Sequence, residues 1–237
     1  MQLTIQRDKE QETFTLSATK VTTLLAALYE IKSKLDPTLT FGAGCRSGIC
    51  GSCAVLVNGK EQLACSYPWQ EGDHIEPLRY HPVLRDLKVD KTKAHETLTK
   101  IHIPKSGLFS SPDPKKVERQ SSCILCDSCY SACPVLAVNP DFLGPFALTK
   151  AWRYTTDSGH PQGDAPTLEA IQKNGIWDCT LCGECTVACP QGIDPKTDIM
   201  MLRGESGKAG FSDPNFASQG FGSPDFGGGF GFDPNAI

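Results

Sequence analysis

Apolar and polar residues alternate loosely in two short stretches at the start of the chain. These stretches, Leu3–Arg7 and Glu12–Leu16, predict two strands. Over the next segment, Val21–Leu35, the apolar residues recur at the three- and four-residue spacing of one helix face. They are Val21, Leu24, Leu25, Leu28, Ile31 and Leu35. The pattern therefore predicts the order strand, strand, helix.

A hairpin is predicted over Ala54–Cys65, because its centre, Asn58-Gly59, is a favoured two-residue turn between strands. A short apolar run around Ile75 and the stretch Pro77–Val89 follow it. These segments complete the first half of the chain, which we expect to contain a sheet.

The second half shows no convincing alternation, and its pattern predicts helices. Pro145 stands where a helix would begin, Phe146–Tyr154 continues that helix, and Thr167–Lys173 has another short helical pattern. Between the halves, Pro104–Arg119 contains proline, serine and lysine, and we interpret it as a linker. We therefore expect one domain over residues 1–105 and a helical domain over residues 106–203.

From Gly204 the composition shifts to glycine, phenylalanine, serine, aspartate and proline, in three loosely similar pieces. Such a segment is unable to build a core, so residues 204–237 are expected to form a disordered tail. The alternative is a docking strip that lays its phenylalanines on a partner. The sequence leaves both interpretations open.

Length and charge narrow the class of protein. A chain of 237 residues is long enough for two domains, each with its own core. The formal net charge of -4 offers no basic patch for nucleic acid, so proteins are the expected partners. The start of the chain lacks the apolar core of a secretory signal, and no stretch approaches the roughly 18 apolar residues of a membrane span. We therefore expect membrane contact only through partners.

Twelve cysteines carry the strongest chemical signal. An even number permits disulfides, but disulfides rarely persist in the reducing compartment that the missing export signal suggests. The spacing favours thiolate ligands, because all the cysteines fall into three runs of four. The runs are Cys45, Cys50, Cys53 and Cys65; Cys123, Cys126, Cys129 and Cys133; and Cys179, Cys182, Cys185 and Cys189.

In the first run, Cys45, Cys50 and Cys53 with a distant fourth cysteine have the plant-type spacing of a [2Fe-2S] cluster. Glycines at positions 42, 44, 48 and 51 let the loop turn sharply and present amide hydrogens to the sulfurs. The predicted hairpin pairs position 53 with 64, and so returns Cys65 beside Cys53. A structural zinc site is the alternative, although zinc ribbons use two short Cys-x-x-Cys knuckles. A phosphate-binding loop is disfavoured, since the run lacks a Lys-Ser/Thr ending.

The second and third runs repeat one pattern, Cys-x2-Cys-x2-Cys-x3-Cys-Pro, which is the bacterial ferredoxin run. In that run the fourth cysteine binds the other cluster, so the expected ligand sets are crossed. One [4Fe-4S] cluster is expected on Cys123, Cys126, Cys129 and Cys189, and a second on Cys133, Cys179, Cys182 and Cys185. Two copies of the pattern argue against chance or zinc.

No other residues form a catalytic arrangement. The five histidines, at positions 74, 81, 95, 102 and 160, lack ligand spacing, and we interpret them as surface or structural residues. We interpret Asp194 and Asp198 as helix-start and solvent-facing charges, and Trp177 as a packing residue that shields a nearby ligand. A [2Fe-2S] domain followed by a two-cluster domain predicts a chain of redox centres. Its task is to move single electrons between a two-electron catalyst and a distant acceptor.

Five stretches of the chain resemble the signatures of a known family, the iron-sulfur subunits of succinate dehydrogenase and fumarate reductase. They are Asp36-Pro-Thr-Leu-Thr-Phe41, Cys45-Arg-Ser-Gly-Ile-Cys-Gly-Ser-Cys53, Pro82-Val-Leu-Arg-Asp-Leu-Lys-Val-Asp90, Asn139-Pro-Asp-Phe-Leu-Gly-Pro145 and Cys189-Pro-Gln-Gly-Ile-Asp-Pro195. The resemblance covers roughly residues 20 to 203. It implies an α+β protein, with a plant-type [2Fe-2S] ferredoxin-like (β-grasp) domain followed by an all-α, bacterial-ferredoxin-like domain with two clusters.

The resemblance also implies partners. A flavoprotein subunit that carries FAD and interconverts succinate and fumarate is expected beside the [2Fe-2S] domain. A membrane-side partner linked to quinone is expected beside the helical domain. The chain itself would then be a peripheral subunit on the cytoplasmic face of the cell membrane, without substrate chemistry of its own.

Two departures from the family pattern change this expectation. The usual quinone-reducing members have a non-cysteine residue at the position of Cys182, which leaves a [3Fe-4S] cluster, so the cysteine predicts a second [4Fe-4S] cluster. The usual members also have a tryptophan pair at Ala137 and Val138 and a histidine at Thr180. The chain thus resembles a divergent branch whose membrane-side partner is a cysteine-rich subunit related to heterodisulfide reductases, rather than a haem-bearing anchor. The alternatives are a thiol-coupled fumarate reductase, another flavoprotein oxidoreductase, or a zinc scaffold.

Overall fold

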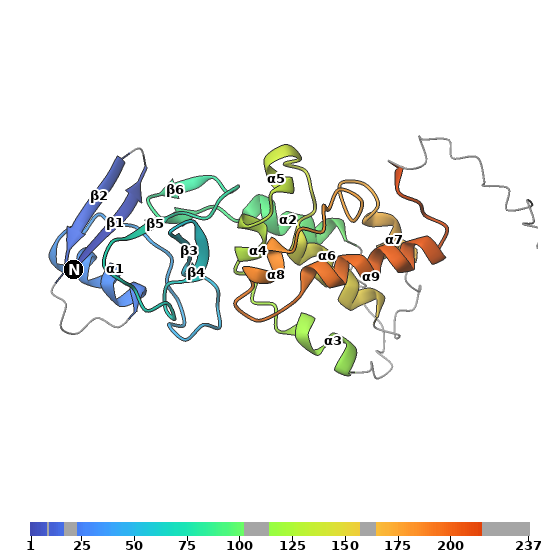
Figure 1. Cartoon of the computed structure of the whole chain (residues 1–237), viewed down its shortest axis with the longest axis horizontal. Coiled ribbons are helices and arrows are strands. Elements are labelled where there is room, and N and C mark those ends of the chain that lie inside the picture. The colour runs from blue at the N-terminus through green and yellow to red at the C-terminus, as the bar shows by residue number, and fades with distance from the viewer. Residues whose placement is uncertain (9, 17–22, 102–113, 157–164, 215–237) are drawn as a thin grey trace, which may run out of the picture.

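The computed structural model describes residues 1–8, 10–16, 23–101, 114–156 and 165–214. A sheet-containing half is followed by a helical half along the long axis of the molecule (Figure 1). The strands are β1 Gln2–Arg7, β2 Glu10–Thr15, β3 Ala54–Val57, β4 Lys60–Leu63, β5 Asp73–Glu76, β6 Val83–Arg85 and β7 Lys88–Val89. The helices are α1 Leu24–Lys34, α2 Thr92–Lys100, α3 Pro114–Ser121, α4 Ser128–Ser131, α5 Val135–Val138, α6 Pro145–Thr155, α7 Ala165–Ala170, α8 Glu184–Val187 and α9 Pro195–Lys208. The expected α+β class is confirmed.

The main sheet has the strand order β2-β1-β5-β3-β4. Strands β1 and β5 run parallel, and the other neighbours are antiparallel. Alternate residues of β1, Leu3 and Ile5, are fully buried together with Leu28 and Ile31 of α1. The predicted order of strand, strand and helix therefore forms because the strand and the helix each bury one apolar face in a shared core.

Helix α1 begins at Leu24, where Thr23 caps it by accepting a hydrogen bond from the Ala26 amide at 3.3 Å. Val21, the first residue of the predicted helical pattern, lies outside the described residues. The hairpin of β3 and β4 forms at the predicted turn, where Val57 pairs with Lys60. Asn58 and Gly59 have φ values of 51° and 77°, as a type I′ turn requires. This turn fixes the register that delivers the fourth cysteine of the first run.

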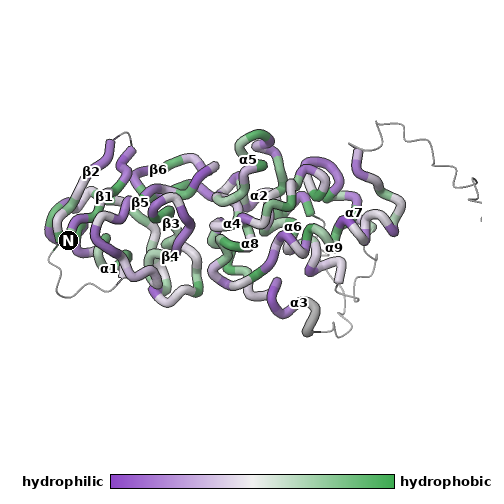
Figure 2. The backbone as a smooth tube through the Cα atoms, in the orientation of Figure 1, coloured by the Kyte–Doolittle hydropathy of each residue, from purple (hydrophilic) through white to green (hydrophobic). Residues whose placement is uncertain are grey.

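Helix α6 lies at the centre of the helical half, packed against α2, α3, α4, α7 and α9. It begins at Pro145, as predicted, and Phe146, Ala147, Leu148 and Ala151 are buried in the second core. Figure 2 shows the hydrophobic residues concentrated inside each half, with α5 as a hydrophobic segment near the edge of the helical half. None of the described helices is long and apolar enough to cross a membrane.

The segment interpreted as a linker is partly helical. Residues 102–113 lie outside the described residues, but Pro114–Ser121 forms α3, which packs against α6. Helix α2 was not expected, and its buried residue Ala94 belongs to the core of the helical half. The boundary at residue 105 stays a prediction, and the packing of α2 favours a division nearer to residue 91.

The tail does not begin at Gly204. Helix α9 continues to Lys208, since Ser206 is fully buried and its hydroxyl accepts a hydrogen bond from the Gln172 side chain at 3.0 Å. Phe211 then packs against the second core. These contacts keep residues 204–211 on the helical half, although their composition resembles that of the following segment. Residues 215–237 lie outside the described residues.

Candidate metal centres

Three cysteines of the first run lie on the loop between α1 and β3, and the fourth follows β4. The Ala64 amide donates to the Cys53 carbonyl oxygen at 3.0 Å, which is the register that the turn predicts. Cys65 therefore returns to the loop, where the Gly48 amide donates to its Sγ atom at 3.2 Å. The hairpin thus brings the fourth candidate ligand to the other three.

Backbone amides of this loop point at the sulfurs. The Sγ atom of Cys45 accepts hydrogen bonds from the amides of Ser47 at 3.4 Å, Ile49 at 3.3 Å and Cys50 at 3.3 Å. Hydrogen bonding, led by the Ser47 amide, lowers the pKa of Cys45 to about 6. The thiolate, which is the form that binds iron, is therefore favoured. Amide donors of this kind also stabilise the extra negative charge of a reduced cluster.

The other cysteines of this run divide into an exposed and a buried side. Cys45 and Cys50 are exposed, and hydrogen bonding, chiefly from the Ser52 hydroxyl, lowers the pKa of Cys50. Cys53 is 4% exposed, and burial raises its pKa to about 11. Ile49, between the two exposed cysteines, is an apolar side chain that is 68% exposed. The candidate [2Fe-2S] site therefore has one open side that carries an apolar contact residue.

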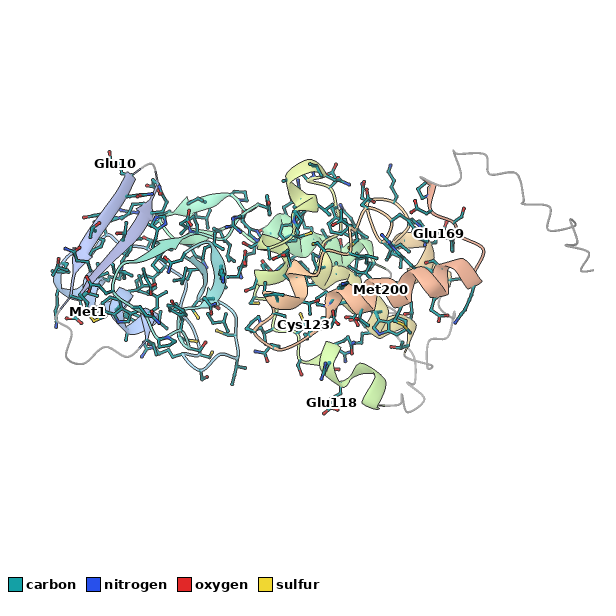
Figure 3. All side chains as sticks on the ribbon, viewed as in Figure 1. Met1, Glu10, Glu118, Cys123, Glu169 and Met200 are labelled. Atoms are coloured by element: carbon teal, nitrogen blue, oxygen red, sulfur yellow. The ribbon has the colours of Figure 1, made fainter. Side chains whose placement is uncertain are left out.

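A cavity in the helical half is lined by four cysteines from two runs: Cys123, Cys126, Cys129 and Cys189. These are the members of the first crossed set, and Figure 3 marks Cys123 on the loop that follows α3. Most of the remaining wall is apolar, and burial raises the pKa of Cys126, Cys129 and Cys189. Thiols that are costly to ionise suit a group that supplies positive charge, as bound iron does.

The remaining four cysteines form a second group. Burial, with smaller contributions from the charges of Cys179 and Cys182, raises the pKa of Cys133 to about 11. Burial, followed by the charges of Cys179 and Cys133, raises the pKa of Cys185 to about 12. Cys133 of the second run thus faces the third run, as the crossed arrangement requires. Cys182 is exposed, whereas Cys133 and Cys185 are buried.

The two ferredoxin-type runs share one backbone conformation. Leu125 and Asp127 have φ values of 50° and 69°, and the equivalent residues of the third run, Leu181 and Gly183, have 57° and 89°. Each loop is followed by a short helix, α4 or α8. The sequence repeat is therefore also a structural repeat, and a left-handed residue is needed at the same place in both loops.

Asp127 takes that left-handed position with a non-glycine side chain, and its carboxylate is fully buried. The carboxylate is 2.9 Å from the Nε2 atom of His95, and His81 and Lys91 each lie 3.8 Å from it. Lys91 also donates to the Cys126 carbonyl oxygen at 2.7 Å. His95 and His81 are thus structural partners of a buried charge, in agreement with the sequence interpretation. The sequence did not reveal this group of side chains around Asp127, because its members are distant in sequence.

Arg203, on α9, holds the segment that precedes the third run. Its guanidinium donates to the carbonyl oxygens of Ile176 at 2.7 Å and Cys179 at 2.6 Å, and lies 5.5 Å from the ring centroid of Trp177. The Trp177 indole donates to Gln172 at 2.7 Å. Trp177 therefore packs beside a candidate ligand as expected, but the role of Arg203 was not visible in the sequence.

The interpretation of Asp198 as a solvent-facing charge is wrong. Its side chain is buried, it accepts a hydrogen bond from Gln120 at 2.8 Å, and burial raises its pKa to about 6. Helix α3, which the sequence did not predict, supplies Gln120 and covers this face of α9. Asp194 caps α9 by accepting from the Thr197 amide at 3.1 Å, as expected for a helix start.

The size of the cysteine groups bears on the zinc alternative. Across the described ranges, no three or more His, Cys, Asp or Glu side chains close around one point tightly enough for a single metal ion. A zinc site needs four ligands about 2.0–2.3 Å from one ion, whereas a cluster needs a wider ring of thiols. The choice between the two rests instead on the cysteine spacing, because both Cys-x2-Cys-x2-Cys-x3-Cys-Pro runs have the pattern of cluster-binding ferredoxins.

The fold and the cysteine groups define a class, the two-domain iron-sulfur proteins of electron transfer. Residues 2–96 match the family model of a 2Fe-2S iron-sulfur cluster binding domain, and residues 119–193 match a 4Fe-4S dicluster domain. The fumarate reductase iron-sulfur subunit of Haemophilus influenzae is 37% identical in an alignment of 229 positions that covers 86% of this chain and 89% of that protein. The chain belongs to the family of fumarate reductase and succinate dehydrogenase iron-sulfur subunits.

Two further comparisons agree with this assignment. The 8-methylmenaquinol:fumarate reductase iron-sulfur subunit of Wolinella succinogenes is 38% identical over 213 residues, covering 80% of this chain and 66% of that protein. A chain of the Mycobacterium smegmatis Sdh1 complex in the apo form superposes with a TM-score of 0.78 at 22% identity, covering 89% of this chain and 97% of that one. The two halves are therefore arranged as in a known fold.

Proposed function

We propose that this chain is the electron-transfer subunit of a succinate dehydrogenase or fumarate reductase complex, passing single electrons between a flavoprotein partner and a membrane-side partner. The proposal rests on one combined observation: the chain has three groups of four cysteines, and it belongs to this family. A [2Fe-2S] cluster on the first group and a [4Fe-4S] cluster on each crossed group would take up and release one electron at a time. No substrate chemistry is assigned to this chain.

Exposed cysteines at two places support where the proposed path begins and ends. At one end, Cys45 and Cys50 are exposed beside the apolar Ile49, which suits contact with a flavoprotein that holds FAD. At the other end Cys182 is exposed, whereas Cys126 and Cys133 are buried between the ends. Electrons would therefore enter or leave at the two ends and stay shielded from solvent between them.

The membrane-side partner is proposed to be the cysteine-rich, heterodisulfide-reductase-like subunit of the divergent branch. Support comes from Cys182, which offers a fourth ligand to the second [4Fe-4S] cluster, and from Val138 and Thr180, which stand where the usual members have quinone-pocket residues. Val138 is 84% exposed at the end of α5, and so leaves an apolar contact residue free for a partner. The complex would lie on the cytoplasmic face of the membrane, reached through its partners.

The proposal is tested on the native complex, purified anaerobically through a tag on this chain. Mass spectrometry should identify a flavoprotein among the other chains, and succinate should reduce the [2Fe-2S] cluster, as followed by electron paramagnetic resonance. The cluster-loaded chain alone should show no reaction with succinate. A complex without a flavoprotein, or succinate oxidation by the isolated chain, would overturn the proposal.

A further inference from the structure

The loops of two candidate centres from opposite halves of the chain touch each other. Gly51 lies between Cys50 and Cys53 on the first loop, and Cys126 belongs to the four-cysteine cavity of the helical half. A Cβ atom placed on Gly51 would be 2.6 Å from the Cβ atom and 2.7 Å from the Cα atom of Cys126. Only glycine permits this approach, because any side chain would overlap the backbone of the other loop.

At the contact between Gly51 and Cys126, the Cys126 side is buried. Cys126 is 7% exposed and belongs to the hydrophobic core of the sheet half, although its run lies in the helical half. Ile124, from the same loop, packs against that core. Solvent is therefore largely excluded at Cys126, where the two loops approach each other.

Three polar contacts hold the junction in place. Lys91 donates to the Cys126 carbonyl oxygen at 2.7 Å, and Gln191 donates to the Gly48 carbonyl oxygen at 3.2 Å. The Ser131 hydroxyl is 2.8 Å from the Glu61 carboxylate of the sheet half. Because these contacts surround the loops, the distance between the loops is set by the fold.

We propose that electrons cross between the two halves at the contact of Gly51 with Cys126, and that Gly51 is a positioning residue for this step. The route runs from the sulfur of Cys50 along its side chain and one peptide bond to Gly51, and then by van der Waals contact to Cys126. Electron tunnelling falls steeply with distance and is weaker across gaps than through bonded atoms, so this route is favoured over paths through the solvent. In the direction of succinate oxidation, one electron would leave a [2Fe-2S] cluster on the first group and reduce a [4Fe-4S] cluster on Cys126 and its partners. Fumarate reduction would reverse the transfer, and no bond would change in either case.

The inference rests on the proposed function, and a matched pair of variants tests it separately. Gly51→Ala inserts a methyl group into the junction, whereas Gly72→Ala, in the turn before β5, inserts one where nothing lies within 4 Å. Both glycines have positive φ values, 66° and 80°, so both substitutions impose a comparable backbone strain. The two variants therefore differ in the separation of the loops.

The measurements use the cluster-loaded native complex with dithionite as reductant, so that neither succinate nor the flavin reaction is needed. With both clusters reduced, Gly51→Ala should weaken the magnetic coupling between the [2Fe-2S] and [4Fe-4S] clusters. With less reductant than fills both clusters, Gly51→Ala should slow electron transfer between them severalfold. Gly72→Ala should leave both quantities as in the wild type. Iron content confirms that each variant is fully loaded.

Should Gly51→Ala fail to assemble its clusters, Gln191→Ala removes the contact with Gly48 without adding volume, and should give a smaller loss of coupling. Unchanged coupling and rate in a loaded Gly51→Ala, or in Gln191→Ala where the first does not load, would overturn the inference. That result leaves the proposed function standing, because the function is judged by reduction with succinate.

Discussion

The guanidinium of Arg203 donates a hydrogen bond of 2.6 Å to the backbone carbonyl oxygen of Cys179. The same group donates to the Ile176 carbonyl oxygen through two nitrogen atoms, at 2.9 Å and 2.7 Å. One side chain of α9 therefore fixes the backbone that leads into the third cysteine run. Its positive charge also lowers the pKa of Cys179, against the larger effect of burial, which raises it.

We predict that Arg203→Met lowers the stability of the chain by freeing the backbone that leads to Cys179. Removing the donor leaves carbonyl oxygens without partners, which should lower the free energy of unfolding by about 2 kcal/mol. Losing the cation should also lower the reduction potential of the cluster on Cys179, because positive charge favours the more negative reduced state. Arg203→Lys should retain most of the potential, since it keeps the charge. Lys208→Met on the same helix, where the side chain is 74% exposed, is the control and should change neither quantity.

Asp198 predicts a pH dependence of stability. Its folded-state pKa of about 6 lies above the ordinary value of 3.8, so the folded chain binds the proton more tightly than the unfolded chain. This group therefore lowers the free energy of unfolding as the pH rises from about 4 to about 6. Asp198→Asn should be more stable than the wild type at neutral pH, by on the order of 2 kcal/mol.

The advantage of Asp198→Asn should shrink as the pH falls below 6, which denaturant titrations under anaerobic conditions would show. Asp141→Asn serves as the control, because the Asp141 side chain is 69% exposed. Equal stability of Asp198→Asn and wild type at neutral pH would mean that the carboxylate is compensated by partners other than Gln120.

Cys182→Ser should convert one [4Fe-4S] cluster into a [3Fe-4S] cluster. Thiolate is the ligand that an iron corner requires, and the exposed position of Cys182 allows the released iron to leave. The oxidised [3Fe-4S] form should be visible by electron paramagnetic resonance, while the [2Fe-2S] signal stays unchanged as the internal control. Two intact [4Fe-4S] signals in the variant would contradict the crossed ligand sets.

Local patterns predicted much of the fold. The Asn58-Gly59 turn is a short-range signal, so it gave the hairpin register and with it the return of Cys65 to Gly48. The proline at 145 likewise marked the start of α6. Such features depend on neighbouring residues, which is why the sequence alone reveals them.

The parts that the sequence did not reveal depend on tertiary contacts. Helix α3 has few apolar residues, and Asp198 is buried beneath its Gln120. Gly204 and Gly207 resemble a tail in composition, yet Ser206 and Phe211 hold that segment on the second core. In each example the contact joins residues more than thirty positions apart, or packing outweighs a weak local preference.

The contacts around the candidate sites show the same division. Cysteine spacing predicted the candidate ligands, because loops that wrap a cluster are local. The partners of these loops are not local: Asp127 meets His95, and Arg203 meets Cys179, across more than twenty residues. One local signal was present but unused, since Asp127 stands where the repeated loop has Gly183.

Iron and acid-labile sulfide analysis of the anaerobically purified chain decides whether the three cysteine groups hold three clusters. We expect about ten iron atoms and ten sulfides per chain, from one [2Fe-2S] and two [4Fe-4S] clusters. Nine irons with a [3Fe-4S] signal in the wild type would show that Cys182 does not bind the fourth iron. Zinc without sulfide would show that the cysteine groups are not cluster sites.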